Sequence, residues 1–177
     1  FDYVVYRGED IISPDGFCGV DDTYKLPGFD LEDPLPLGSN REVLVAEFVA
    51  DTDFEYYQNY GSASAVENRI NSLMNSINLL YETQNEIIHE VQGIVVRPES
   101  NDPYSSNSID TRLEQVRSVW NSTNNPPHDL VQLFSGASFS GSTIGLAYVG
   151  AVCSQFEYSV VESDCCGSFG CATDLSN

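Results

Sequence analysis

The alternation of apolar and polar positions divides the middle of the chain into strands and helices. Residues 43–50 form a mostly apolar run of strand length, which is typical of a buried strand. After a serine-rich start at residues 62–64, apolar residues recur at three- and four-residue steps, which predicts an amphipathic helix with a serine cap. Its apolar stripe consists of Val66, Ile70, Leu73, Met74, Ile77, Leu80 and Tyr81.

The pattern of apolar and polar positions also predicts strands and a helix in the second half of the chain. Residues 87–96 are rich in β-branched side chains and predict a second strand, and residues 143–150 predict a third. Between them, a shorter helix capped by Ser108 or Asp110 is expected. Its stripe is Ile109, Leu113, Val116 and Trp120. The order strand–helix–strand–helix–strand predicts an α/β sandwich, with a mixed sheet that contains parallel strands and is flanked by helices.

The two ends of the chain lack this pattern. Residues 1–41 are rich in Pro, Gly and Asp and predict an extended arm, with one strand candidate at residues 3–6. The first residues have neither a basic start nor an apolar stretch, so we expect a processed chain rather than a signal peptide. We therefore expect three parts: an arm at 1–41, a folded body at 42–164 and a cysteine-rich tail at 165–177.

Charge and cysteine content narrow the functional classes. The chain has 27 acidic and 7 basic residues, a formal net charge of -20, which disfavours binding to nucleic acid or anionic lipid. No apolar run approaches the roughly 20 residues that span a bilayer, so membrane insertion is not expected. Five cysteines and a glycosylation sequon at Asn121 together indicate a secreted, extracellular glycoprotein.

Asp51-Thr52-Asp53 has alternating carboxylates. Calcium is a candidate cofactor there, although the glycine and distal glutamate of an EF-hand loop are missing. The alternative is a solvated strand end.

Residues 128–133 read H-D-x-x-Q-L, and they are followed by the glycine-rich stretch 139–150 and then by Cys153. This combination resembles the reprolysin (adamalysin) family of zinc metalloendopeptidases. Residues 43–51 are similar to the family's first catalytic-domain strand, which ends in Val-Ala-Asp. Upstream, Phe17-Cys18-Gly19-Val20 resembles the cysteine-switch sequence at the end of the propeptide. The resemblance covers residues 15–164 and implies a fold of the zincin or metzincin kind, in truncated or degenerate form.

The resemblance implies a substrate-binding edge strand beside the active-site cleft. An unpaired strand edge offers N–H and C=O groups to an extended peptide. The alternative is an ordinary edge strand covered by the N-terminal arm. The residues concerned are Thr143, Ile144, Gly145, Leu146, Ala147 and Tyr148.

The resemblance also assigns roles to the cysteines. A Cys18 thiolate held over zinc would occupy the metal's open position and keep the enzyme latent. The odd cysteine count leaves at least one thiol unpaired. With Cys18 unpaired, two disulfides are expected among Cys153, Cys165, Cys166 and Cys171. The alternative is that Cys18 is half of a disulfide.

The stretch from Cys18 to Arg41 contains only two basic residues, Lys25 and Arg41. A dibasic processing site is therefore absent, and retention of the arm is expected.

The zinc motif H-E-x-x-H-x-x-G-x-x-H is missing from these 177 residues. Only His89 and His128 are present, so they cannot form a three-histidine zinc site. His89 precedes Glu90 but lies in a predicted strand, where residues four apart do not converge on one face as they do on a helix. His128 is expected to be packed and hydrogen-bonded. No catalytic residue or metal ligand is assigned in this chain, and zinc is expected only if a catalytic helix exists elsewhere in the protein.

The sequence and the family resemblance support two candidate functions. The first is part of a secreted zinc endopeptidase zymogen, inactive as given, whose intact form would act on a peptide or protein substrate. The second is a non-catalytic extracellular scaffold or binding protein, a pseudoprotease that self-associates or joins a larger assembly.

Overall fold

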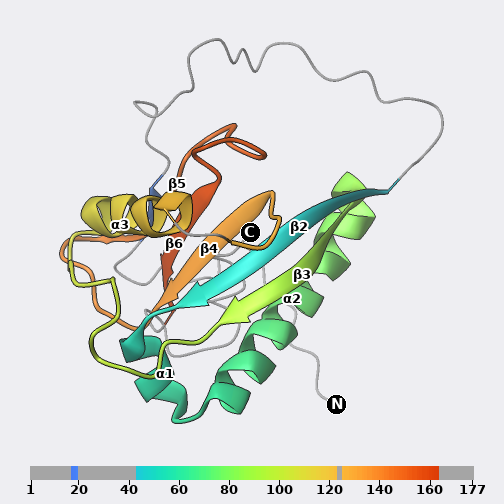
Figure 1. The fold of residues 1–177 in the computed structure, drawn as a ribbon. Helices are drawn as coiled ribbons and strands as arrows, with labels where there is room; N and C mark the ends of the chain where they lie inside the picture. Colours follow the sequence, from blue (N-terminus) through green and yellow to red (C-terminus); the bar gives the residue numbers. More distant parts are fainter. Residues whose placement is uncertain (1–16, 20–42, 123–124, 164–177) are drawn as a thin grey trace, which may run out of the picture.

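The computed structural model describes residues 17–19, 43–122 and 125–163, with the backbone alone at 17–19. Within these residues, six strands form one mixed sheet with helices on both of its faces (Figure 1). The elements, in chain order, are β1 (Phe17–Gly19), β2 (Leu44–Thr52), α1 (Phe54–Tyr60), α2 (Ala63–Asn85), β3 (Ile87–Val95), α3 (Ile109–Ser122), β4 (Leu130–Ser135), β5 (Thr143–Ala147) and β6 (Tyr158–Glu162).

The sheet has the strand order β1-β5-β6-β4-β2-β3. Strand β2 pairs in parallel with both β3 and β4, and β4 pairs in parallel with β6. Strand β5 runs antiparallel to β6 and pairs with β1 in parallel on its other side. The predicted α/β architecture, with a mixed sheet and flanking helices, is confirmed.

Each face of the sheet has its own hydrophobic core. Helix α3 covers one face, where Leu113, Val116 and Trp120 pack against residues of β4 and β6 such as Val131 and Val160. Helix α2, with α1 at its start, covers the other face. That core consists of Phe48, Ala50, Tyr56, Val66, Ile70, Leu73, Met74, Ile77, Phe134 and Val161. Most members of the two predicted apolar stripes therefore form the surfaces that hold the three layers together, but Leu80, which was predicted to belong to the α2 stripe, is exposed.

Helix α2 begins as its sequence predicts. Ser62 is the N-cap, and its side-chain oxygen accepts a hydrogen bond from the Ala65 backbone N–H at 3.2 Å. The helix stops where Glu86 takes a left-handed conformation with φ of 58°. Strand β3 follows at once, so α2 lies against the strand to which it leads.

The structure contains four elements that the sequence pattern did not predict: β1, α1, β4 and β6. Helix α1 has seven residues and the three strands have three, six and five residues, which is too short for a periodic pattern to stand out. The predicted third strand is also shorter, because β5 ends at Ala147.

The strand end at Asp51-Thr52-Asp53 is buried, so its interpretation as a solvated end is wrong. Asp51 and Asp53 both have no exposed surface. Arg97 donates to Asp51 through Nε at 2.9 Å and Nη2 at 2.7 Å, while Trp120 Nε1 donates at 2.8 Å. Protein donors therefore surround the Asp51 carboxylate, as buried charge requires.

Asn78 of α2 protects the outer edge of the sheet. Its side-chain nitrogen donates to the His89 carbonyl, and its oxygen accepts from the His89 backbone N–H, both at 2.8 Å. Strand β3 is the last strand in the order, so this amide takes the place that a further strand would occupy beside His89.

Replacing Asn78 with alanine is therefore expected to have two effects. The half-buried backbone groups of His89 lose their partner, which costs about 1–3 kcal/mol of stability. The unprotected edge also favours association between copies of the chain. Urea unfolding and sedimentation velocity measure the two effects, with Asn75→Ala on the exposed side of α2 as the matched control. Identical behaviour of the two variants would contradict this role for Asn78.

Candidate functional site

Strand β5 lies between β6 and β1. Gly145, Leu146 and Ala147 pair with Val161, Val160 and Ser159 of β6, respectively. On the other side of β5, Phe17, Cys18 and Gly19 pair with Thr143, Gly145 and Leu146. The predicted edge strand is thus covered by the N-terminal arm in this structure, and Tyr148 follows directly after it. Binding of a substrate peptide to β5 stays a prediction.

The pairing of β1 with β5 contains an irregularity at Ile144. The register shifts between Phe17 and Cys18, so that Ile144 has no Cα partner in β1. Such bulges bend a strand locally and change the direction of a side chain. Cys18 is therefore aligned with Gly145, a position that has no side chain of its own to obstruct the arm.

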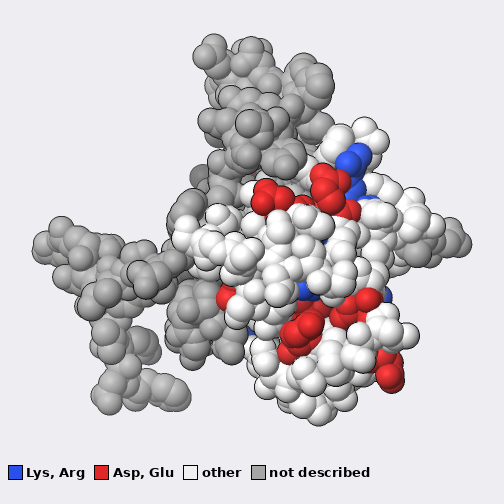
Figure 2. Space-filling view, turned by 90° about the vertical axis from the view of Figure 1, so that its left-hand side faces the viewer, with Lys and Arg blue, Asp and Glu red and all other residues white. Residues whose placement is uncertain are grey.

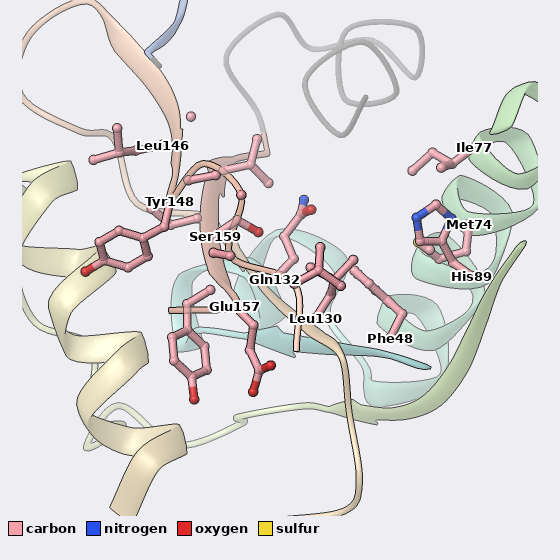
Figure 3. A pocket seen from close by; sticks show the side chains of 18 of the residues that line it. Phe48, Met74, Ile77, His89, Leu130, Gln132, Leu146, Tyr148, Glu157 and Ser159 are labelled. Atoms are coloured by element: carbon pink, nitrogen blue, oxygen red, sulfur yellow. The ribbon is translucent and has the colours of Figure 1, made fainter. Parts of the chain in front are cut away.

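A hollow of about 370 Å³ lies beside β5 on the face of the sheet that α2 covers. Figure 3 shows its labelled side chains, with Met74, Ile77 and His89 on one side, Leu146 and Tyr148 on the other, and those of β4 and β6 between them. Its lining is mainly apolar, with Gln132, Glu157, Ser159 and His89 as the polar side chains. A concave, mostly apolar surface with a few polar groups is typical of a binding site.

His89 forms the α2 end of this hollow. Its Nδ1 lies 3.0 Å from the Asn78 side-chain oxygen, which can only accept, so Nδ1 carries the proton. The ring packs edge-on against Tyr81 and Phe48, with centroid distances of 4.9 and 6.3 Å. Burial lowers the pKa of His89 below its ordinary value, because the charged imidazolium loses hydration. This histidine is a packed, neutral residue of β3, whereas neighbouring Glu90 is exposed.

The lowered pKa of His89 predicts a loss of stability in mild acid. The unfolded chain protonates His89 near pH 6.5, before the folded protein does, so stability is full above this pH and falls as the pH drops toward the folded pKa. Urea unfolding at pH 7.5 and pH 5.5 measures the difference. A His89→Phe variant keeps the aromatic packing and should show a smaller decrease; an equal decrease in both proteins would contradict the assignment.

The H-D-x-x-Q-L segment joins β4 to its neighbours. The Asp129 backbone N–H donates to Glu47 O, and Asp129 Oδ2 accepts from the Glu47 N–H, both at 2.8 Å. Among the described residues, the exposed Cys153 has no disulfide partner, and its thiol donates to Asp129 Oδ1 at 3.0 Å. This bond raises the pKa of Cys153 to about 11, so the thiol stays protonated and weakly nucleophilic at neutral pH. The partners predicted for it, Cys165, Cys166 and Cys171, lie outside the described residues, so the disulfides stay a prediction.

His128 is held by neighbouring residues and does not line the hollow. Its Nδ1 lies 2.7 Å from Pro126 O, its Nε2 lies 3.3 Å from Glu157 Oε1, and its ring packs edge-on against Trp120. His89 packs against α2 on one face of the sheet, while His128 packs against Trp120 of α3, which covers the other. In the part of the chain that the structure describes, no three His, Cys, Asp or Glu side chains are grouped to hold a metal ion. These residues do not fit a zinc centre.

On the face that Figure 2 shows, acidic groups occur at separate places, with basic groups beside some of them. Among the described residues, no helix has the length and apolar character needed to cross a membrane.

Strand β5, covered by β1, lies beside an apolar hollow in a domain with a mixed sheet and flanking helices. The reprolysin-type model of metallo-peptidase family M12 matches residues 41–173, and the chain belongs to this family. The resemblance that the sequence motifs indicate is thereby confirmed.

Two kinds of relative accompany this match. Zinc metalloproteinase-disintegrin-like atrase-A of Naja atra is 28% identical over 123 residues, which cover 66% of this chain and 19% of that protein. The chain thus matches about a fifth of the relative's length. A solved structure of a chaperone-substrate complex is similar in fold, with a TM-score of 0.59 and 17% identity over 75% of this chain and 23% of the other. Metalloproteinase-II from Bacteroides fragilis gives a TM-score of 0.46 and 16% identity, over 67% and 37% of the two chains.

Proposed function

We propose that this chain is part of a secreted zinc endopeptidase zymogen, consisting of the end of its propeptide and the first part of its catalytic domain. The observation that carries the proposal is the pairing of β1 with β5, in which Cys18 is aligned with Gly145. Residues 17–19 of the arm occupy the strand edge that a substrate peptide would need, so this pairing excludes substrate from β5. These 177 residues are inactive on their own, because they contain two histidines and no H-E-x-x-H sequence.

The hollow supports the same proposal. Phe48, Leu130 and Val161 line the hollow and belong to the hydrophobic cluster that packs against α2. In an intact enzyme, a metal-binding helix packed against this apolar surface would lie next to β5 and the arm. The Cys18 thiolate would then be the zinc ligand that replaces the attacking water, which is the chemistry of a latent metalloenzyme.

A second candidate function is a non-catalytic extracellular binding protein. It is favoured by the covered state of β5, because an arm without a dibasic processing site remains in place and fills the position of the substrate. In this case the protein binds no zinc at all.

Latency of the full-length protein distinguishes these functions. We expect the full-length wild type to cleave a generic peptide slowly in the presence of zinc, and Cys18→Ser to be constitutively active. Cys153→Ser is the matched cysteine control and should remain latent. Zinc bound at one equivalent, together with activity of the Cys18 variant, supports the zymogen. Absence of both zinc binding and cleavage in every variant would contradict it and favour the binding protein.

A further inference from the structure

Residues 148–157 connect β5 to β6 and are in contact with both the hollow and α3. Residues from the two ends of this connection line the hollow, while the Tyr148 side chain points toward α3 (Figure 3). We propose that Glu114 and Arg117 of α3 are positioning residues, which hold this connection and the end of β5 in the form that accepts an added strand. This inference rests on the proposed function, in which an extended segment pairs with β5.

Tyr148 directly follows β5, and its side chain is tied to α3. The Tyr148 hydroxyl donates to Glu114 Oε1 at 2.6 Å, and only 7% of the residue is exposed. A hydrogen bond to a carboxylate is stronger than one between neutral groups. Because Tyr148 is covalently joined to Ala147, the last residue of β5, this bond fixes the position at which the strand ends.

Arg117 supports the same contact from the next turn of α3. Its Nη1 donates to Glu114 Oε2 at 3.3 Å, which leaves Oε1 to accept from Tyr148. Its Cζ lies 4.2 Å from the centroid of the Phe156 ring, and this ring packs edge-on against Tyr148 with centroids 5.2 Å apart. The ion pair itself is partly exposed and adds little stability. Its effect is to join both ends of the connection to one helix.

Helix α3 is a firm support for these contacts. Arg112 in its first turn pairs with Asp53 at 3.1 Å, and Trp120 near its end donates to Asp51 at 2.8 Å. Both carboxylates are fully buried at the end of β2, so a shift of the helix along the sheet would break a buried polar contact. The connection is therefore held to β2 through α3, and the edge of β5 is preorganised before a strand pairs with it.

Hydrogen–deuterium exchange of the full-length protein tests this role. Tyr148→Phe keeps the ring and removes the hydroxyl. We expect exchange to become about tenfold faster or more at residues 143–147 and 17–19, which corresponds to the loss of one hydrogen bond to a charged group, with no change in β3. Glu114→Leu should have the same effect. Glu114→Gln keeps an oxygen that accepts from the hydroxyl, so it should restore most of the protection.

Asn78→Ala is the matched control, because it weakens the opposite edge of the sheet and should leave exchange in β5 unchanged. Unchanged exchange of β5 in Tyr148→Phe would overturn the inference. A uniform increase throughout the sheet, or equal exchange in Glu114→Gln and Glu114→Leu, would overturn it as well. The measurement needs neither zinc nor cleavage, so its failure is distinguishable from failure of the proposed zymogen, which the latency assay of Cys18→Ser reports.

Discussion

Replacing Asp53 with alanine is expected to remove about 3–5 kcal/mol of stability, a large part of what a domain of this size has. Asp53 is fully buried, and Arg112, its ion-pair partner at 3.1 Å, is only 1% exposed. Asp53 Oδ1 also accepts from the backbone N–H groups of Tyr56 at 2.8 Å and Gly136 at 2.9 Å, and Oδ2 accepts from the Ser135 hydroxyl. The alanine variant leaves the Arg112 charge buried without its counter-ion, and α1 loses its cap.

Chemical denaturation of Asp53→Ala measures this loss, and a double variant isolates its cause. Asp53→Ala combined with Arg112→Met removes both charges, and it should recover part of the stability that the single change loses. A loss below about 1 kcal/mol in the single variant, or a double variant less stable than the single one, would contradict the ion pair as the main cause.

Gly136→Ala is the second change with a large expected effect. Gly136 follows β4, and a Cβ atom there would lie 2.4 Å from both Glu55 C and Tyr56 N of the α1 backbone. Backbone atoms cannot move aside as a flexible side chain does, so β4 and α1 must separate, at a cost of about 1–3 kcal/mol or more. Gly93→Ala is the matched control, because a Cβ at Gly93 meets nothing within 4 Å.

Thermal and urea unfolding of the two glycine variants test this close approach. We expect Gly93→Ala to have almost wild-type stability or slightly more, since alanine reduces the entropy of the unfolded chain. Equal stability of Gly136→Ala and Gly93→Ala would show that α1 does not pack against β4 as the structure describes.

The elements predictable from the sequence are those whose pattern repeats over several turns or alternations. The stripe of α2 has enough members to define its buried face, and the β-branched run of β3 defines a strand. Helix α1 has no such signal. It forms because Asp53 caps it and because Tyr56 is buried against Phe134, a contact across many residues of sequence.

The same limit applies to buried polar residues. Arg112 lies next to the predicted apolar stripe of α3, where a charged side chain reads as solvent-exposed. Its burial depends on Asp53, which is 59 positions earlier in the chain, and no local pattern contains this information. Asn78 likewise looks like an ordinary polar position of α2 until β3 brings His89 next to it.

The candidate site was predictable only in part. The family motifs identified the segment that forms β5 and singled out Cys18. They left two alternatives for this strand, a substrate-binding edge and an edge covered by the N-terminal arm, and the structure shows it covered by β1. The parallel direction of β1, the shift at Ile144 and the hollow beside α2 arise from tertiary packing, so no sequence motif predicts them.

The central claim is that this chain is part of a latent zinc endopeptidase. Peptide mapping of the native protein by mass spectrometry, read through to its true C-terminus, tests this most directly. The zymogen account predicts peptides that continue past Asn177 into an H-E-x-x-H helix, with Cys18 retained in the latent form. A native protein without this motif would contradict the claim, exclude zinc catalysis and leave the binding protein as the function of the fold.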